Sequence, residues 1–237
     1  MASFSFAGTT SSKLIVPYSP DLDFGSGDFT VEWLQYSIST PENQCPTAFS
    51  RGDWFMSAAT EPPSSFIYWY NNYGTHQLYP LEKTTGWIHY AITRAKGTTR
   101  LFMNGKVQLS FADATDYTNI RLDLVIGNEN VPAETAEASF NGYMTYFAWN
   151  KGYARYTDNF TVSNTYPPIL PSTVLMLSAY GNRGTLGATV QNSNVELKPI
   201  SAPNFMPINA PQLKRRAPFS RMLQTFARWK SRIIMLS

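Results

Sequence analysis

Short runs of β-branched and aromatic residues, each ended by turn-forming residues, recur from residue 3 to about residue 198 of this 237-residue chain. The clearest run is Phe29–Tyr36, in which Phe29, Val31 and Trp33 occupy alternate positions and so share one face. A period of two is typical of a half-buried β-strand. Because such runs repeat at short intervals and helical periodicity is almost absent, the sequence predicts an all-β sandwich or barrel.

A hairpin is predicted between residues 99 and 109. The run Thr99–Met103 is followed by Asn104-Gly105 and then by Lys106–Leu109. Asn-Gly between two β-rich runs favours a type I′ turn, since both central residues of that turn need a positive φ. With the run Trp87–Arg94 directly before it, this region is predicted to form an antiparallel meander.

The pattern changes after residue 198, and the chain is predicted to divide into three parts. Residues 1–198 form the sandwich. Residues 199–218 carry a proline at about every fourth position, which predicts an extended linker arm lying over a surface, because proline removes backbone donors and fixes φ. Residues 219–237 show apolar residues at helical spacing and are predicted to form a short basic amphipathic helix. The residues predicted to dock to a partner are Arg215, Arg216, Phe219, Met222, Leu223, Phe226, Trp229 and Ile233.

Charge separates the tail from the rest of the chain. Of 19 basic and 16 acidic residues, seven basic and no acidic ones lie in 212–237, which leaves twelve basic against sixteen acidic residues in 1–211. A basic amphipathic segment can dock in a partner's groove, lie on a membrane, contact nucleic acid, or fold back on its own sandwich. The linker ahead of it favours reaching a neighbouring protein, and the bulky apolar stripe exceeds what phosphate contact requires.

The sequence carries no signal for export or membrane insertion. Cys45 is the only cysteine, so an intrachain disulfide is impossible. The N-terminus lacks a basic region followed by an apolar core, and no apolar run approaches the roughly 20 residues of a membrane span. We therefore expect the protein to mature in a reducing compartment such as a cytoplasm, including that of an infected host.

Six segments, in order, resemble the concanavalin A-like lectin/glucanase superfamily, in particular its laminin-G-like jelly rolls. These segments are Phe29–Trp33, Gly86–Arg94, Leu101–Lys106, Ile126–Asn128, Phe140–Met144 and Ala154–Thr161. The last of them, Ala-Arg-Tyr-Thr-Asp-Asn-Phe-Thr, is similar to a signature of such domains in bacteriophages and large DNA viruses. The resemblance covers about residues 2–198, leaves the tail outside, and implies a jelly-roll β-sandwich.

By analogy, the resemblance implies a non-enzymatic structural protein of a virus particle (virion), such as a minor capsid, decoration or tail-associated protein. Such a protein is made in the host cytoplasm, and its arm docks to neighbouring virion subunits in a multi-copy assembly. The alternative is a lectin-like carbohydrate-binding module for attachment to host glycans. Family members often carry an acidic pair where this chain has Thr145 and Tyr146, so loop bracing or calcium binding by that pair is not implied here.

The carboxylates disfavour an enzyme. Glucanases of this superfamily need closely spaced carboxylates on one strand face, because one protonates the leaving oxygen while another attacks or stabilises the sugar cation. A Glu-x-Asp-x-Glu pattern is absent from the sequence. The acidic pairs fall in predicted loops and are interpreted as solvated: Asp21 and Asp23, Asp113 and Asp116, and Glu134 and Glu137.

Metal and cofactor signals are weak. His76 and His89 have no serine or cysteine partner in a recognisable setting, and His89, inside a predicted strand, is interpreted as structural. The sequence has neither a Cys/His metal spacing nor a phosphate-binding glycine loop, so no cofactor is expected. Asn128-Glu129-Asn130 offers oxygen ligands of the kind that calcium takes, but a polar turn is the favoured interpretation.

Aromatic and amide side chains concentrate between residues 66 and 79. Aromatic faces stack on sugar rings and amides select hydroxyls, although alternate residues of a strand must face the core. The candidate carbohydrate-binding residues are Trp69, Tyr70, Asn71, Asn72, Tyr73 and His76. Core packing or contact with another protein is the alternative for this segment.

Overall fold

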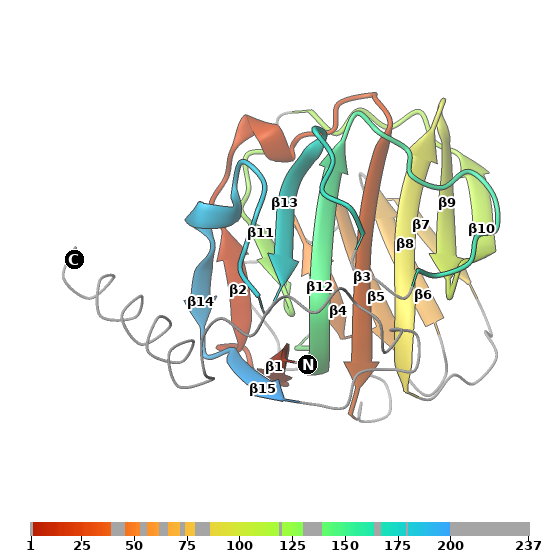
Figure 1. Ribbon diagram of the computed structural model, residues 1–237. Helices are drawn as coiled ribbons and strands as arrows, with labels where there is room; N and C mark the ends of the chain where they lie inside the picture. The colour runs from red at the N-terminus through yellow and green to blue at the C-terminus, as the bar shows by residue number, and fades with distance from the viewer. Residues whose placement is uncertain are drawn as a thin grey trace.

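Two antiparallel sheets stacked face to face make up the fold (Figure 1). The computed structural model describes residues 2–38, 46–52, 56–61, 66–71, 74–78, 86–118, 120–129, 139–163, 167–178 and 180–199. Within these residues the prediction of an all-β jelly-roll sandwich is confirmed. Pro199, the first residue of the predicted arm, is instead the last residue of a strand of the sandwich, and the rest of the predicted arm and the predicted helix, with all eight docking residues from Arg215 to Ile233, lie outside the described residues.

The first sheet, sheet A, has β3 and β12 at its centre. Both β1 and β13 pair with the same edge of β12, β1 with its first residues and β13 with its later ones. In order, its strands are β10 (Lys106–Ala112), β9 (Thr98–Met103), β8 (Trp87–Ala95), β3 (Phe29–Ser37), β12 (Asn141–Lys151), β1 (Ala2–Ala7) and β15 (Glu196–Pro199), with β13 at Thr173–Ser178. Strands next to one another along the chain, such as β8, β9 and β10, pair as the predicted meander.

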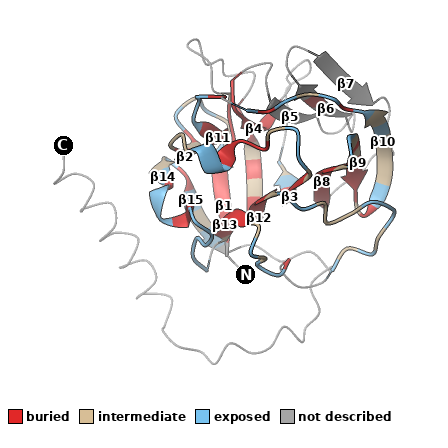
Figure 2. Cartoon of the chain, turned by 90° about the horizontal axis from the view of Figure 1, so that it is seen from above, coloured by how far each residue is buried: buried red, intermediate tan, exposed pale blue. Residues whose placement is uncertain are grey.

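The second sheet, sheet B, lies behind sheet A in Figure 1. In order, its strands are β14 (Gln191–Ser193), β2 (Lys13–Val16), β11 (Leu124–Ile126), β4 (Thr47–Ser50), β5 (Met56–Glu61), β6 (Phe66–Asn71) and β7 (Gly74–Leu78). Short 3-10 turns occur at Pro20–Leu22 and Gly187–Thr189. The residues exposed on β10 and β14, at the ends of the two sheets, are visible in Figure 2.

The alternation in β3 directs three large side chains into the space between the sheets. Phe29, Val31 and Trp33 are fully buried there, and Trp33 stacks on Tyr90 of the neighbouring strand. Burial of such side chains removes their apolar surface from water and contributes roughly 1.5–3 kcal/mol for each. The predicted core face of β3 is therefore confirmed.

The other face of β3 is buried as well, which the half-buried strand pattern did not predict. Thr30, Glu32 and Leu34 have at most 2% of their surface exposed. Between β12 and β13 the chain passes over the outside of sheet A (Figure 1). We call its described residues, 152–163 and 167–172, the crossing segment; hydrogen bonds to Thr30 and Glu32 fasten it to β3.

The predicted Asn-Gly hairpin is confirmed. Asn104 and Gly105 have φ values of 49° and 79°, the left-handed conformation that a type I′ turn requires. A Cβ atom on Gly105 would collide with the carbonyl oxygen of Phe160 in the crossing segment. The glycine therefore serves both the turn and the approach of the crossing segment.

Near its described end the chain passes from one sheet to the other. β14 pairs with β2 in sheet B, β15 pairs with β1 in sheet A, and Val195 between them is buried in the core. Asn192 clamps this connection, since its side chain exchanges two hydrogen bonds with the backbone of Val195. The sandwich thus includes strands up to Pro199.

Candidate functional site

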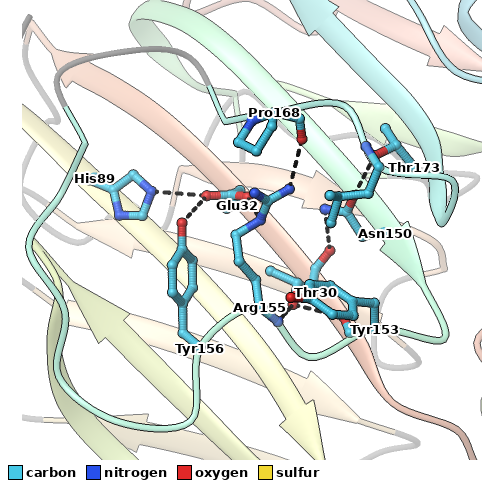
Figure 3. A network of polar contacts seen from close by, with 10 residues as sticks. Thr30, Glu32, His89, Asn150, Tyr153, Arg155, Tyr156, Pro168 and Thr173 are labelled. Atoms are coloured by element: carbon cyan, nitrogen blue, oxygen red, sulfur yellow. Dashed lines mark hydrogen bonds and ion pairs between the residues drawn. The ribbon is translucent and has the colours of Figure 1, made fainter.

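A polar network lies on the outer face of sheet A, centred on a carboxylate that the sequence analysis did not single out. Glu32 sits between Val31 and Trp33 on β3, and because those two face the core, Glu32 faces the crossing segment. Its side chain is fully buried. Figure 3 shows Arg155 and Tyr156 of the crossing segment and His89 of β8 directed toward it.

Three side chains hold the two oxygens of Glu32. Arg155 Nε lies 2.8 Å from Oε1 and forms an ion pair with it. The Tyr156 hydroxyl donates to Oε2 at 3.0 Å, and His89 Nε2 lies 3.3 Å from the same oxygen. Since a carboxylate oxygen can only accept, the hydrogen bond between His89 and Glu32 requires Nε2 of His89 to be the donor. The buried Glu32 side chain thus faces the guanidinium of Arg155 at one oxygen and the Tyr156 hydroxyl and His89 ring at the other.

Tyr156 connects this network to the hairpin. Burial, and then the nearby charge of Glu32, raise the pKa of Tyr156, so that its hydroxyl stays protonated and able to donate. Its ring stacks on Phe160, with ring centroids 3.6 Å apart. The Phe160 N–H in turn donates to the Gly105 carbonyl at 2.8 Å. The crossing segment is thus fastened to β3, β8 and the β9–β10 turn at once.

Threonine and asparagine side chains fasten the ends of the crossing segment. The Arg155 backbone N–H donates to Thr30 Oγ1 at 2.8 Å, and Thr30 donates to the Tyr153 carbonyl at 3.0 Å. At the other end, Thr173 donates to Asn150 Oδ1 at 2.7 Å and accepts the Leu170 N–H. The segment Ala154–Thr161 was recognisable in the sequence, but its role, closure of the outer face over Glu32, is visible only in three dimensions.

Two of the carboxylates predicted to be solvated are buried instead, so that prediction was wrong for Asp23 and Asp113. Asp23 is paired with the buried guanidinium of Arg51 at 2.8 Å, and burial lowers the pKa of that arginine. Asp113 accepts hydrogen bonds from the hydroxyls of Thr99 and Tyr117 at 2.6 and 3.0 Å.

The pKa of Asp113 reflects two opposing effects. Burial raises it, but the hydrogen bonds from Thr99, Thr115 and Tyr117 together outweigh burial and hold the pKa below its ordinary value. Asp21 and Asp116 are exposed, as predicted, and Glu134 and Glu137 lie outside the described residues. The two buried carboxylates, Asp23 and Asp113, therefore stabilise the loops in which they lie.

The predicted carbohydrate-binding residues do not form a site that the structure describes. Trp69 is fully buried, packed among core rings including Phe29, Phe49 and Tyr117, so it presents no face to a sugar. For Trp69 the prediction was wrong, because the inward face of β6 takes it into the core. Tyr70 and Asn71 lie in β6 and His76 in β7, the edge strand of sheet B, and Asn72 and Tyr73 lie outside the described residues.

A different group of aromatic residues lies on the outer face of sheet A, beside the crossing segment. Tyr36 of β3 pairs in register with Trp87 of β8 on one side and with Tyr143 of β12 on the other. We call these three residues the aromatic row. Tyr36 lies 5.8 Å from Trp87 and 6.2 Å from Tyr143, measured between ring centroids.

The three side chains of the aromatic row differ in their exposure to solvent. Tyr36 is 36% exposed and Tyr143 is half-buried, whereas Trp87 is largely buried and packs with Leu34 and Tyr146. The register continues from Tyr143 to Ser5 of β1 and Glu196 of β15. Period-two alternation could have found Tyr36 on the face opposite Trp33, but only strand pairing shows that three aromatic rings from distant segments meet there.

In the segment Asn128-Glu129-Asn130, for which a polar turn was favoured over a calcium site, the described residues make structural contacts. The Asn128 side chain is buried, donates to the Thr10 carbonyl and to Ser139, and accepts from the Glu129 N–H. Within the described ranges, His, Cys, Asp and Glu side chains do not gather in threes as metal ligands would. Over those same ranges, none of the helices has the length and apolarity of a membrane span.

Solved structures share this fold. A protein of Bacteroides ovatus described as carbohydrate binding superposes with a TM-score of 0.61 at 17% sequence identity, covering 88% of this chain and 62% of its own. A heptameric pentraxin from Limulus polyphemus (TM-score 0.47, 15% identity, 62% and 75% covered) and mouse laminin alpha1 domains LG4-5 (0.48, 12%, 64% and 42%) are more distant. This chain thus spans about three fifths of the Bacteroides protein.

Sequence comparison identifies the family. The curated proteins contain no match to this chain. A family model described as the Concanavalin A-like lectin/glucanases superfamily matches residues 9–152, more than half of the chain, and includes β2 through β12. With the two stacked sheets and the laminin-G-like order of the segments, the protein therefore belongs to the concanavalin A-like lectin/glucanase superfamily.

Proposed function

We propose that this protein is a non-catalytic, lectin-like domain that binds carbohydrate at the aromatic row of sheet A. The observation that carries the proposal is the row of three rings on one sheet face, in which Tyr36 is exposed, Tyr143 is half-buried and Trp87 packs against Tyr36 from the neighbouring strand. Flat aromatic rings offer the apolar face of a sugar ring a stacking surface with few torsions to immobilise. The fold shared with the Bacteroides ovatus protein, described as carbohydrate binding, supports this choice.

We propose a non-catalytic domain because the carboxylates of sheet A are not placed as the catalytic pair of a glycosidase. Its strands carry two acidic residues, Glu32 and Glu196. Glu32 is buried and ion-paired with Arg155, and Glu196 lies three strands away, which is roughly 14 Å at the usual strand spacing. Paired carboxylates of a glycosidase stand about 5–9.5 Å apart with the sugar between them. Neither residue of sheet A therefore meets that requirement.

A glycan array with the full-length chain tests the proposal. We expect binding that Tyr36→Ala and Tyr143→Ala abolish. Tyr153→Ala is the matched control, because Tyr153 is also an exposed tyrosine, 45% exposed, but lies at the other end of β3 beside Thr30. Absence of any glycan bound by the unchanged protein, or equal loss in the Tyr153 control, would reject the aromatic row as a sugar site.

A second candidate is a structural component of a virus particle, which displays the sandwich and uses its tail for attachment. It is favoured by the seven basic residues in 212–237 against an acidic excess in 1–211, and by the virus-like segment Ala154–Thr161. Oppositely charged surfaces steer association between copies or partners. In an assembly assay with the full chain, Arg215→Glu with Arg216→Glu should prevent incorporation into particles. Unchanged incorporation would count against attachment through the tail.

A further inference from the structure

The strand β10 lies at one end of sheet A, and within the described residues β9 is its only neighbouring strand. Its side chains alternate, so that Leu109 and Phe111 pack partly against the core while Ser110 and Ala112 are exposed. The register shifts between Val107 and Leu109, where one extra residue forms a β-bulge. After the bulge the pairing with β9 is regular, and residues 109–112 contain neither charge nor proline. This stretch therefore lacks the features with which proteins usually prevent pairing at a sheet edge.

Pairing with β9 decides which backbone groups of β10 point away from the sheet. The N–H of Asp113, directly after β10, donates to the Gly97 carbonyl, directly before β9. Because the hydrogen-bonded positions alternate along an antiparallel ladder, Phe111 also directs its N–H and C=O toward β9, whereas Ser110 and Ala112 direct theirs outward. The described part of the chain gives neither Ser110 nor Ala112 a further backbone partner. Both residues therefore offer a donor and an acceptor to another strand.

The first residues of β10 are closed by the crossing segment. Asn159 Oδ1 accepts the outward-pointing N–H of Val107 at 2.8 Å. Next to it, the Phe160 N–H donates to the Gly105 carbonyl. A polar side chain thus takes the position that a neighbouring strand would occupy. The open part of the edge is therefore limited to the residues that follow the bulge.

The two other edges with described side chains are less suited to pairing. β15 carries Glu196 and Lys198, both at least half exposed, and ends at Pro199. Charged side chains and proline at a sheet edge discourage the approach of another strand. β14 is only three residues long, Gln191–Ser193. Among these edges, β10 is therefore the one that favours strand addition.

We propose that two copies of this protein pair through β10, antiparallel about a two-fold axis at Phe111. In this register Ser110 of each copy lies opposite Ala112 of the other, and both outward-pointing residues of each strand exchange hydrogen bonds. An axis at Ser110 or at Ala112 would use only one such residue per copy. Phe111 lies opposite its own counterpart, where cross-strand aromatic pairs stabilise a sheet. The contact is the same surface on both copies, as a two-fold dimer requires.

Charge favours the same arrangement. Lys106 is exposed at the start of β10, and Asp116 is exposed shortly after its end. The two residues lie five positions before and five positions after Phe111. Antiparallel pairing about Phe111 therefore brings the basic start of one strand to the side of the acidic end of the other. Such complementarity favours association and selects the register.

The dimer has a consequence for the proposed sugar site. Residues directly opposite in paired strands point to the same face of a sheet, so the outer faces of both A sheets lie on one side of the dimer. Trp87 lies on β8, two strands from β10, so the two aromatic rows begin five strand steps apart, roughly 24 Å. Two sites on one side bind a multivalent glycan surface with higher avidity. This consequence rests on the proposed function, but the dimer itself does not.

Sedimentation velocity of the full-length chain over a range of concentrations tests the dimer. We expect a concentration-dependent dimer, because the contact provides only about four hydrogen bonds. Ser110→Glu with Ala112→Glu places like charges directly opposite and should weaken the dimer about tenfold. Ser110→Glu with Ala112→Lys is the matched control, in which each Glu faces a Lys, and should retain the dimer. Position 110 lies opposite Arg100 of β9, so Glu suits it in both variants, and thermal unfolding checks that both are folded.

A disulfide tests the register. In a Cys45→Ser background, Phe111→Cys places two thiols at the axis, with Cα atoms about 4.5 Å apart, within the range of a disulfide. Leu109→Cys is the control, since Leu109 is also half-buried but lies about 14 Å from its own counterpart. We expect mild oxidation to give a covalent dimer with Phe111→Cys and not with Leu109→Cys.

Three results would overturn the proposal. A chain that stays monomeric at every concentration would show that β10 does not pair. Equal dimerisation of the Glu-Glu and Glu-Lys variants would assign the association to another surface, such as the basic tail. Faster crosslinking of Leu109→Cys than of Phe111→Cys would contradict the register. Because no sugar enters these measurements, a failed glycan array leaves their result unaffected, and the reverse also holds.

Discussion

Removal of the arginine that neutralises Glu32 should destabilise the whole sandwich. In Arg155→Met the aliphatic part of the side chain is kept, but the fully buried carboxylate loses its ion pair. Breaking a buried pair by removal of one partner costs about 3–5 kcal/mol, because the remaining charge stays in a medium that solvates it poorly. A typical domain has about 5–15 kcal/mol of unfolding free energy in total. The substitution should therefore remove a large share of the stability.

Urea unfolding followed by tryptophan fluorescence measures this loss. Lys198→Ala is the matched control, since Lys198 also pairs with a glutamate, Glu196 at 3.3 Å, but both side chains are at least half exposed. An exposed pair contributes only about 0–1 kcal/mol.

The double variant Glu32→Gln with Arg155→Met removes both charges. It should therefore cost less than the Arg155 change alone, since no charge is left without its partner. If Arg155→Met cost no more than Lys198→Ala, or if the double variant were the least stable of all, the reasoning about the buried charge would be refuted.

Three further outcomes are expected. Gly105→Ala should destabilise more than Gly97→Ala in thermal unfolding: both glycines have a positive φ, but only at Gly105 would a Cβ meet the Phe160 carbonyl, and equal effects would contradict that contact. The pKa of Asp113 is held below its value in the unfolded chain, so its contribution to the free energy of unfolding is present above about pH 4 and is lost as pH falls through the folded pKa. Asp113→Asn should therefore flatten the acid side of the plot of stability against pH. An unchanged plot would contradict a stabilising role of the Asp113 carboxylate. Trp69→Ala should cost about 3–5 kcal/mol and weaken the near-ultraviolet circular dichroism; a fully stable variant would show that the ring is not in the core.

Local patterns were enough to predict much of the fold. Alternation in Phe29–Tyr36 and the Asn104-Gly105 turn depend on contacts between residues close in the chain, and both predictions hold in the structure. The family resemblance rests on segments of this kind in a preserved order. Charge and proline content likewise separated the tail at about residue 199, although the tail's conformation stays a prediction.

The candidate site depends on contacts that no local pattern contains. Glu32 is separated from His89 by 57 residues and from Tyr156 by 124, and the strand pattern around it is the same whether its carboxylate meets water or an arginine. Sequence reasoning placed Trp69 at a sugar site because an aromatic residue has the same composition signal in a core and on a surface. Which face of β6 meets sheet A is decided by packing between the two sheets.

Residues that are close in the sequence therefore specify the strands, the turns and the charged tail, because secondary-structure propensity and hydrophobic periodicity act over a few residues. The burial of Glu32, the inward position of Trp69 and the meeting of Trp87, Tyr36 and Tyr143 arise from strand pairing and from the passage of the crossing segment over sheet A. These are long-range contacts, whose free energy depends on desolvation and packing by segments remote in the chain, so they are decided only when the sandwich closes.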